Sequence, residues 1–410
     1  MEISKRLAKQ DSVAKFFFLL FWLLKPFYIR ASGTIQIGDI CLVIAVALIL
    51  LRGYIRINLI DVKFYIFFGF VLLVNLIYFI KLDDFIFLKS TLFFLFNLLA
   101  IYGFRELIND DYFLYKLDKV LKLNLLIQLF LYLLDLGRWH SEGRYMGTYN
   151  DPNQLGFAIL TTYCLIYCIN RKLNIKGKWI FFIIASFMIY VTSSMGMLLG
   201  MLILFVCEQY FRISVVKKEY KLVYTFYLMF LTIGLLLIAS MGILAISGNL
   251  KGNFYIFDRL LYKLDKGDTF LESFIIDRFL YPIVNAPKYL LLGSGEGLMI
   301  RFAPKEGEPH STWLSICFYY GIIPFLFLLS WVKDNLRKID YYVIPVYACV
   351  FIEALTLINH RQPSFWLLIV LGSVLTRKKR EDNFISNNYE KQNLVIKNER
   401  NKIQHNNSNI

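Results

Sequence analysis

The chain has 410 residues, of which 58% are hydrophobic and 17% aromatic, and its mean hydropathy is +0.54. This composition excludes an ordinary soluble domain, and apolar runs long enough to cross a hydrocarbon core recur along the sequence. The formal net charge of +15 would suggest a nucleic-acid partner for a soluble protein. In a membrane protein it reflects basic cytoplasmic loops, so no nucleic-acid partner is expected.

The apolar runs predict an all-α fold, a polytopic bundle of about twelve transmembrane helices. The first run has basic flanks but no small-residue cleavage site, which indicates a retained anchor rather than a signal peptide. The runs at 178–193 and 195–211 are separated by only a few residues, so their division is the weakest in the pattern. The candidate spans are 13–31, 35–51, 62–80, 85–103, 118–136, 153–169, 178–193, 195–211, 222–246, 310–331, 341–357 and 363–376.

Basic residues alternate between the two sides of these spans when the N-terminus is placed in the cytoplasm. The inner segments carry most of the Lys and Arg, ending in the cluster at 377–380, whereas each short outer loop carries one or two. Short cytoplasmic loops collect these residues, so both termini are predicted to be cytoplasmic. The result is one transmembrane domain at 1–376 and a polar, Asn-rich tail at 377–410 that is predicted to be disordered.

One outer segment, residues 247–309, is much longer than the others. It contains eight basic and eight acidic side chains, which excludes burial in lipid because each charge at the bilayer centre costs about 3 kcal/mol. Its apolar clusters have a helical period, so we expect short amphipathic helices at the outer interface. Long loops of this kind usually carry function.

The stretch EGRYMGTYNDPNQLGF at 142–157 leads from an outer loop into a span. Asp151 and Pro152 predict a helix start, with Asp151 as the N-cap and Gln154 closing a capping box. The unpaired amides of a helix N-terminus attract anions, and Arg144 would strengthen such a site because guanidinium binds phosphate bidentately. The alternative is a loop arginine that contacts only water or lipid headgroups.

A second stretch, residues 289–329, contains LLGSGEG followed by HSTWLSICFYYG. Its glycines lack the Lys-Ser/Thr and the strand–helix context of a nucleotide loop. His310 opens a candidate span at the outer face, where it would titrate near neutral pH and could accept a proton or hold a hydroxyl. A plain polar cap of the helix is the competing interpretation.

Few charges fall within the candidate spans, and such residues are functional candidates by default. Glu353 and His360 lie seven residues apart, a spacing that places them on one helix face. The six cysteines all fall inside apolar runs without metal-ligand spacing, so neither a disulfide nor a metal site is predicted.

In this order and spacing, the two stretches resemble the O-antigen polymerase and O-antigen ligase superfamily of bacterial surface-glycan assembly. RYMGTYNDPNQLG is similar to that family's Arg-x-x-Gly-x-x-x-x-Pro-Asn approach to a span, and His310 and Gly321 have its His-x10-Gly spacing. QIGDI at 36–40 and the long outer loop before a late span also look like the family. Met195 stands where the family often has an arginine, so one anion contact of the family is missing or is supplied elsewhere.

The resemblance implies a multi-pass protein of the bacterial inner membrane that transfers a glycan from a polyprenyl pyrophosphate, with membrane lipid around it. It implies polymerisation of lipid-linked repeat units without a metal or other cofactor, and a flippase and a chain-length regulator as partners. His310 would be catalytic with Glu353 as its partner, and Arg144 and Arg278 would bind the pyrophosphate. Further candidates for the site are Arg259, Arg301, Asn153, His360 and Arg361.

Two alternatives remain open at this point. A ligase would transfer the glycan to the lipid A core, and the aromatic composition and loose motifs favour a polymerase over it. A flippase of lipid-linked oligosaccharides belongs to another class and would need broken helices or charges spread through the bundle. The gathering of polar residues on the outer side favours chemistry there.

Overall fold

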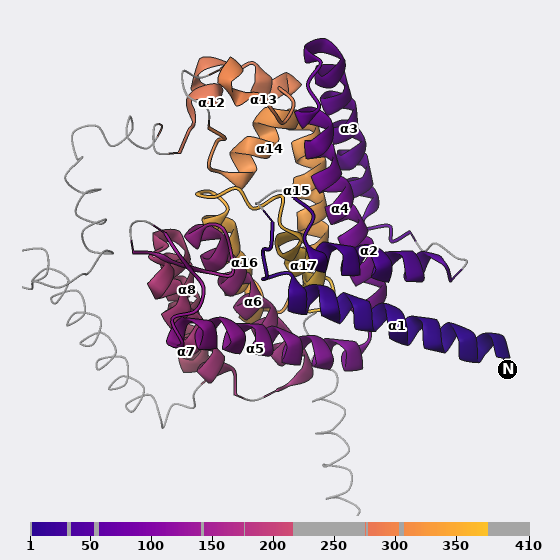
Figure 1. The fold of residues 1–410 in the computed structure, drawn as a ribbon, viewed down its shortest axis with the longest axis vertical. Coiled ribbons are helices and arrows are strands. Elements are labelled where there is room, and N and C mark those ends of the chain that lie inside the picture. Colours follow the sequence, from indigo (N-terminus) through magenta and orange to yellow (C-terminus); the bar gives the residue numbers. More distant parts are fainter. Residues whose placement is uncertain are drawn as a thin grey trace, which may run out of the picture. The chain divides into compact units, whose positions relative to one another are not determined.

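The computed structural model describes residues 2–30, 34–52, 57–140, 143–175, 177–215, 275, 278–302 and 307–375. The described residues all belong to one compact unit, Met1–Leu375. The candidate span at 222–246, Arg259 and the tail at 377–410 lie outside the described residues. Figure 1 shows the arrangement of the elements.

The described residues are mostly helical, which confirms the predicted class. The first helices are α1 (Glu2–Leu24), α2 (Ile37–Leu50), α3 (Val62–Leu82), α4 (Ile86–Leu107) and α5 (Asp111–Leu133). A short hairpin of β1 (Arg138–Trp139) and β2 (Tyr145–Gly147) follows, and then α6 (Pro152–Leu173), α7 (Lys178–Thr192) and α8 (Met195–Val215). The C-terminal half contains α12 (Tyr281–Asn285), α13 (Tyr289–Leu292), η3 (Met299–Arg301), α14 (Thr312–Tyr320), α15 (Ile322–Leu336), η4 (Tyr341–Val343), α16 (Ile344–Glu353) and α17 (Pro363–Gly372).

Two described helices, α3 and α4, are long and apolar enough to cross a membrane by length and composition. The most apolar window of α3 has a mean hydropathy of 2.1, yet only 22% of it is buried. Leu73, Ile77 and Ile80 are among its exposed side chains. Exposed apolar faces of this size usually contact a partner or a membrane. The described residues do not cover this face, and lipid could cover it. Figure 1 also shows α1 and α5 running across the direction of α3 and α15, which is not a simple parallel bundle.

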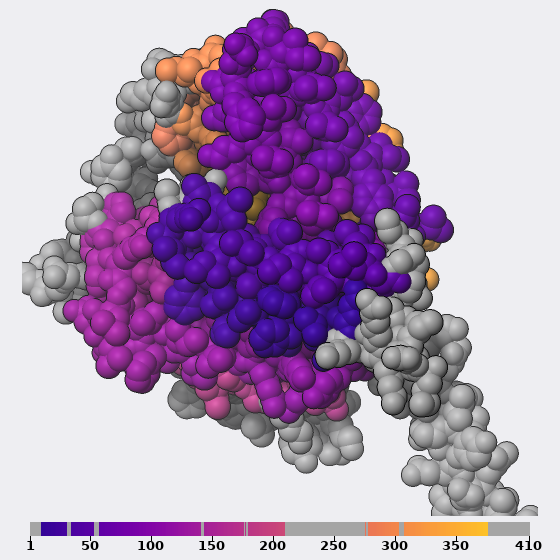
Figure 2. Space-filling model, turned by 45° about the vertical axis from the view of Figure 1, so that its right-hand side comes forward, coloured from indigo at the N-terminus to yellow at the C-terminus, as the bar shows by residue number. Residues whose placement is uncertain are grey.

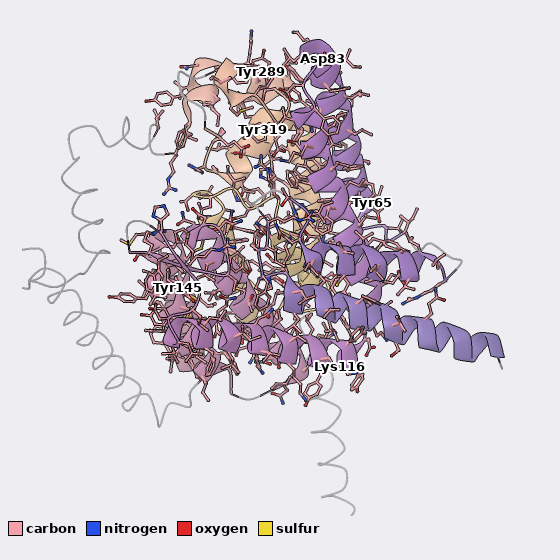
Figure 3. The ribbon with its side chains drawn as sticks, viewed as in Figure 1. Tyr65, Asp83, Lys116, Tyr145, Tyr289 and Tyr319 are labelled. Carbon is pink, nitrogen blue, oxygen red and sulfur yellow. The ribbon has the colours of Figure 1, made fainter. Side chains whose placement is uncertain are left out.

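Contacts between segments distant in the sequence occur near two opposite ends of the unit Met1–Leu375. At one end, Lys172 in the last turn of α6 pairs with Asp111 at the start of α5 at 3.1 Å. At the other end, the Ser90 hydroxyl of α4 donates to the Glu296 carbonyl at 2.8 Å. Figure 3 shows Asp83 and Tyr289 at one end and Lys116 at the other.

The α3–α4 hairpin packs beside the C-terminal loops at the same end. The Tyr78 hydroxyl donates to the Gly293 carbonyl at 3.1 Å. In Figure 2 the orange atoms of this loop region lie beside the purple hairpin, and the indigo N-terminal helices cover the adjoining face. The hairpin therefore connects the N-terminal and C-terminal parts of the chain.

The candidate span at 310–331 is not one helix, because Gly321 divides it into α14 and α15. Gly321 has φ +90°, and a Cβ there would lie 2.6 Å from the Leu291 carbonyl oxygen. The amides of Ser294 and Gly295 donate to the Phe318 and Tyr319 carbonyls at 3.0 and 2.9 Å. The GSGEG loop thus fills the helix break at Gly321. Hydropathy does not reveal this break because the residues on both sides of it are apolar.

The shared helix face predicted for Glu353 and His360 is also wrong. Helix α16 ends at Glu353, and the chain then turns before α17, so His360 lies in the turn. Seven residues share a face only where the helix continues. The division between α7 and α8 is confirmed, since Ser193 adopts a left-handed conformation there with φ 53°.

Polar residues are also buried beside segments that the basic-residue pattern predicts to be inner, which corrects the expectation that they gather on the outer side. Asp61 accepts from the Arg105 Nη2 at 2.6 Å, and the same nitrogen donates to Asn335 at 2.7 Å. The Trp331 indole donates to Asp61 at 2.9 Å. Each buried charge has a partner, as a low-dielectric interior requires. The distribution of polar residues therefore does not argue against a flippase.

Candidate functional site

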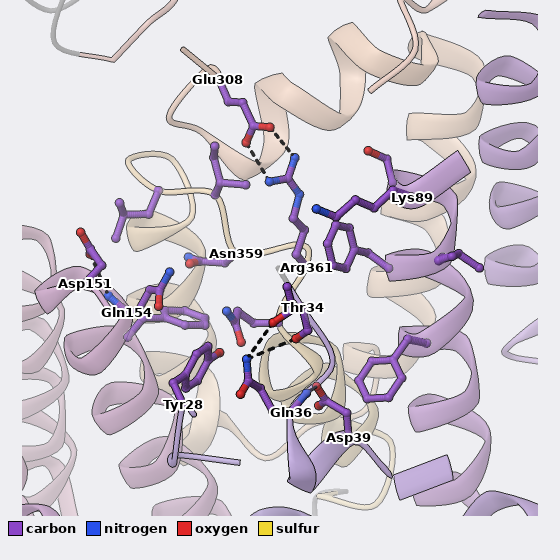
Figure 4. Close-up of a pocket in the computed structure, with 18 of the residues that line it drawn as sticks. Tyr28, Thr34, Gln36, Asp39, Lys89, Asp151, Gln154, Glu308, Asn359 and Arg361 are labelled. Carbon is purple, nitrogen blue, oxygen red and sulfur yellow. Dashed lines mark hydrogen bonds and ion pairs between the residues drawn. The ribbon is translucent and has the colours of Figure 1, made fainter. Parts of the chain in front are cut away.

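A cavity of about 790 Å³ lies where several segments distant in the sequence meet. Its wall comes from five parts of the chain: the segment between α1 and α2, the start of α4, the start of α6, the loop before α14, and the turn between α16 and α17. Figure 4 shows Tyr28 and Gln36 on one side, Lys89 on another, and Glu308 and Arg361 above them. Asn153 and His310 also line it, so both sequence stretches singled out above contribute to one site.

The N-cap and the first helical residue of α6 are as the sequence predicts. The Asp151 carboxylate accepts from the backbone amides of Asn153 and Gln154 at 2.7 and 3.2 Å, and Pro152 is the first helical residue. These amides are therefore occupied by the N-cap. The expectation that they are free to hold an anion is wrong, because the capping carboxylate already satisfies them.

Arg144 is buried behind this helix start and does not line the cavity. Its Nε donates to the Thr192 carbonyl at 2.9 Å, and its Nη2 donates to the Asn153 side-chain oxygen at 2.8 Å. Ser194 donates to the same oxygen at 3.2 Å. Arg144 thus orients the Asn153 amide, whose residue faces the cavity.

The hairpin β1–β2 holds Arg144 in this place. The His140 amide donates to the Arg144 carbonyl at 2.8 Å, immediately before β2. The Tyr145 ring beside it is fully buried, and its hydroxyl donates to the Leu136 carbonyl at 2.7 Å. The sequence analysis did not predict this hairpin, although Gly143 and Gly147, both with positive φ, are a turn signal at its two ends.

His310 lies on the cavity wall immediately ahead of α14. Its amide donates to the Arg278 carbonyl at 2.7 Å, and its ring meets Phe279 edge to face at 5.2 Å. Burial lowers the pKa of His310 and the Arg278 charge lowers it further, against the opposing effects of Glu308 and Asp151. The neutral imidazole is therefore the form present at neutral pH, and a neutral ring nitrogen can accept a proton.

Arg278 supports this region from behind the cavity wall. Its Nη1 donates to the Thr356 carbonyl at 2.5 Å, and it does not line the cavity. Glu353 is buried nearby, where its Oε2 accepts from the Asn359 amide, and its Oε1 has no hydrogen-bond partner among the described residues. Asn359 lines the cavity, so Glu353 reaches the site only through it.

Arg361 carries the strongest set of charged contacts at the site. Its Nη1 and Nη2 donate to the two oxygens of Glu308, each at 2.8 Å. Its Nε and Nη2 donate to Glu296 Oε1 at 2.8 and 2.5 Å. Burial disfavours the charge of Arg361, but the two carboxylates outweigh it and hold its pKa well above the ordinary value.

Glu296 is 1% exposed and does not line the cavity. Its carboxylate also accepts from the Tyr320 hydroxyl at 2.6 Å and lies 3.1 Å from His360 Nε2. Burial raises its pKa, but Arg361 and His360 overcome that effect and bring the value to about 2. His360 is itself fully buried against the Phe94 ring, so it belongs to this network and not to the cavity wall.

The remaining candidates are not at the cavity or are not described. Arg301 donates to the carbonyls of Leu298, Ser294 and Gly297, so it closes the GSGEG loop. Arg259 lies outside the described residues. Among the residues that the structure describes, no cluster of three or more His, Cys, Asp or Glu could hold a metal ion.

No protein-family model matches the chain, and no curated protein sequence matches it at a significant level.

Sequence reasoning missed several residues that line the cavity. Lys25, which no motif indicated, pairs on its wall at 2.6 Å with Asp39 of QIGDI. Lys89 lines it from the first turn of α4, and Glu296 accepts hydrogen bonds from Arg361 of its wall. QIGDI gave a signal for Asp39, whereas the GSGEG motif gave a signal for glycines and not for the carboxylate between them.

Proposed function

We propose that the chain polymerises lipid-linked oligosaccharide repeat units by glycosyl transfer from a polyprenyl pyrophosphate at the outer face of the bacterial inner membrane. One observation carries the proposal. Five segments that the basic-loop pattern places outside converge on a single cavity, which holds His310, the Arg144-oriented Asn153 and the cations Lys25, Lys89 and Arg361. The resemblance to the O-antigen polymerase and ligase superfamily supplies the substrate class.

In the proposed reaction, an acceptor hydroxyl forms a new bond to the anomeric carbon of the donor while the bond from that carbon to the diphosphate oxygen breaks. The hydroxyl proton passes to the neutral His310 ring. Negative charge grows on the departing diphosphate, so cations already in place lower the barrier. The membrane placement and the cytoplasmic position of both termini belong to the proposal, and the exposed apolar face of α3 supports contact with lipid.

A cavity lined by amides and aromatic rings suits a sugar. Asn153, Gln154 and Gln362 present amide groups, while Tyr28 and Phe96 present rings. Amides bind sugar hydroxyls, and aromatic rings bind the apolar faces of sugars.

The test is the surface-glycan ladder of a deletion strain complemented with variants. His310→Ala is expected to reduce long chains about 100-fold or more, the range of a lost general base. Arg144→Ala is expected to reduce them through a misplaced Asn153. His140→Ala is the matched control, since His140 lies in the outer hairpin and does not line the cavity. Normal ladders in both site variants would contradict the assignment.

The same strain separates the proposal from its alternatives. Single repeat units on the lipid A core of the deletion strain indicate a polymerase. Long lipid-linked chains beside a bare core indicate a ligase. Accumulation of single lipid-linked units on the cytoplasmic face indicates a flippase.

A further inference from the structure

We propose that Arg361 and Lys89 form an anion subsite of the cavity for the diphosphate group of a ligand, and that the Glu308 carboxylate occupies this subsite in the free protein. The identity of the ligand as a lipid-linked diphosphate rests on the proposed function. The binding of a diphosphate group to this subsite does not rest on the proposed function.

The Glu308–Arg361 contact has the geometry that arginine uses for phosphate. Two guanidinium nitrogens donate to two carboxylate oxygens, each at 2.8 Å. This parallel pair is the bidentate arrangement that guanidinium adopts with either a carboxylate or a phosphate. A carboxylate in that position is therefore a side-chain stand-in for an anionic ligand.

The two carboxylates on Arg361 differ in how firmly they are held. Glu296 is 1% exposed and is fixed by Tyr320 and His360 as well as Arg361. Glu308 is 37% exposed, and Arg361 is its hydrogen-bonded partner within the described residues. Glu308 can therefore leave while Glu296 keeps the guanidinium in place with Nη1 and Nη2 turned to the cavity.

The pairing of the other charged groups on the cavity wall shows which cations are available to bind an anion. Lys25 is neutralised by Asp39 at 2.6 Å, and Asp151 is engaged as the N-cap of α6. The Lys89 side chain has no ion-pair or hydrogen-bond partner among the described residues, and Figure 4 shows it extending from α4 toward Arg361. Once Glu308 is displaced, these two cations face the same part of the cavity.

Arg144 and Arg278 lie behind the wall, where they bind backbone carbonyls and Asn153. In this arrangement they position cavity residues, and Arg361 and Lys89 make the direct contact with the anion. A diphosphate carries more charge than a carboxylate, so it competes effectively for the guanidinium.

The test measures binding by the purified full chain in nanodiscs of neutral lipid. The probes are inorganic diphosphate and a polyprenyl diphosphate, with anionic phospholipid nanodiscs as a third arm. Glu308→Gln removes the competing charge and keeps the side-chain shape, so the Kd for both diphosphates is expected to fall about ten-fold, which corresponds to 1.4 kcal/mol. Lys89→Gln is expected to weaken binding about two- to five-fold, as for an exposed charge pair.

Lys116→Gln is the matched control for Lys89, because Lys116 is also exposed and lies at the opposite end of the helices. Arg361→Lys keeps the charge beside Glu296 but loses the bidentate contact, so it is expected to weaken binding more than ten-fold. Tighter binding in Glu308→Gln for both probes supports a diphosphate subsite, and tighter binding for the lipid probe alone assigns it to the lipid-linked form.

An unchanged or weaker Kd in Glu308→Gln overturns the inference, as does equal binding in the Lys89 and Lys116 variants. Binding of anionic phospholipid with no diphosphate binding also overturns it. These outcomes are independent of the glycan ladder, so the subsite and the proposed function can fail separately.

Discussion

Replacing Glu296 by Gln tests the buried network that holds Arg361 in place. The substitution keeps the size of the side chain and removes its charge. The carboxylate accepts from Arg361 and Tyr320 and lies beside His360, and it is 1% exposed. Of the two carboxylates that pair with the Arg361 guanidinium, the variant therefore leaves only Glu308, which lines the cavity.

The magnitude follows from the pKa of Glu296. It falls from the ordinary 4.5 to about 2, because Arg361 and His360 outweigh the opposing effect of burial. At 1.36 kcal/mol for each pH unit, this difference corresponds to about 3 kcal/mol of stability that depends on the charge. A carboxyl group with a lowered pKa contributes this stability above pH 4.5 and loses it progressively as the pH falls toward 2.

The measurement is the thermal unfolding midpoint of the purified full chain, followed by tryptophan fluorescence between pH 7 and pH 3. Glu296→Gln is expected to lower the midpoint at pH 7, and the gap from the unchanged protein should narrow below pH 4.5. Glu308→Gln is the control, since its exposed carboxylate is expected to contribute less than about 1 kcal/mol. A gap that stays constant with pH, or an equal loss in the control, would refute the reasoning.

Two further predictions address the helix break and the proposed base. Gly321→Ala is expected to destabilise the protein by about 2 kcal/mol or more. The reason is that φ is +90° and the new Cβ would lie 2.6 Å from the Leu291 carbonyl oxygen. In the control Gly69→Ala, a Cβ meets nothing within 4 Å, so the thermal unfolding midpoint should be unchanged or raised. The glycosyl-transfer rate should rise with pH and level off, and the midpoint of this rise should lie below the ordinary histidine pKa of 6.5, because burial and Arg278 lower the pKa of His310. Removing the charge with Arg278→Gln should move that midpoint upward. A midpoint that does not move would contradict the assignment of His310 as the base.

Local signals in the sequence were sufficient where the structure depends on local contacts. Asp151 and Pro152 predicted the start of α6 because an N-cap satisfies amides two and three residues away. The turn at Ser193 was visible because polar residues interrupt two apolar runs. The boundaries of α3 and α4 followed from length and hydropathy.

The sequence failed where contacts connect distant residues. Glu296 binds Arg361, which is 65 positions later in the chain, and neither motif indicates that pairing. Gly321 stands in an apolar run whose hydropathy is continuous, so the break depends on the backbone of the GSGEG loop. Arg144 was expected to face an anion, but its burial behind Asn153 is decided by α7 and β2 together.

The positions of the buried charges support a membrane placement for the α3–α4 hairpin. Asp61 precedes α3, and its partner Arg105 lies in the last turn of α4. At the other end of the hairpin, Ser90 and Asn75 bind the backbone of Glu296, whose carboxylate holds Arg361. Buried ions are costly in hydrocarbon unless they are paired and near an interface. A helix pair fixed by charges at its two ends, with an exposed apolar surface between them, satisfies both conditions when lipid covers that surface.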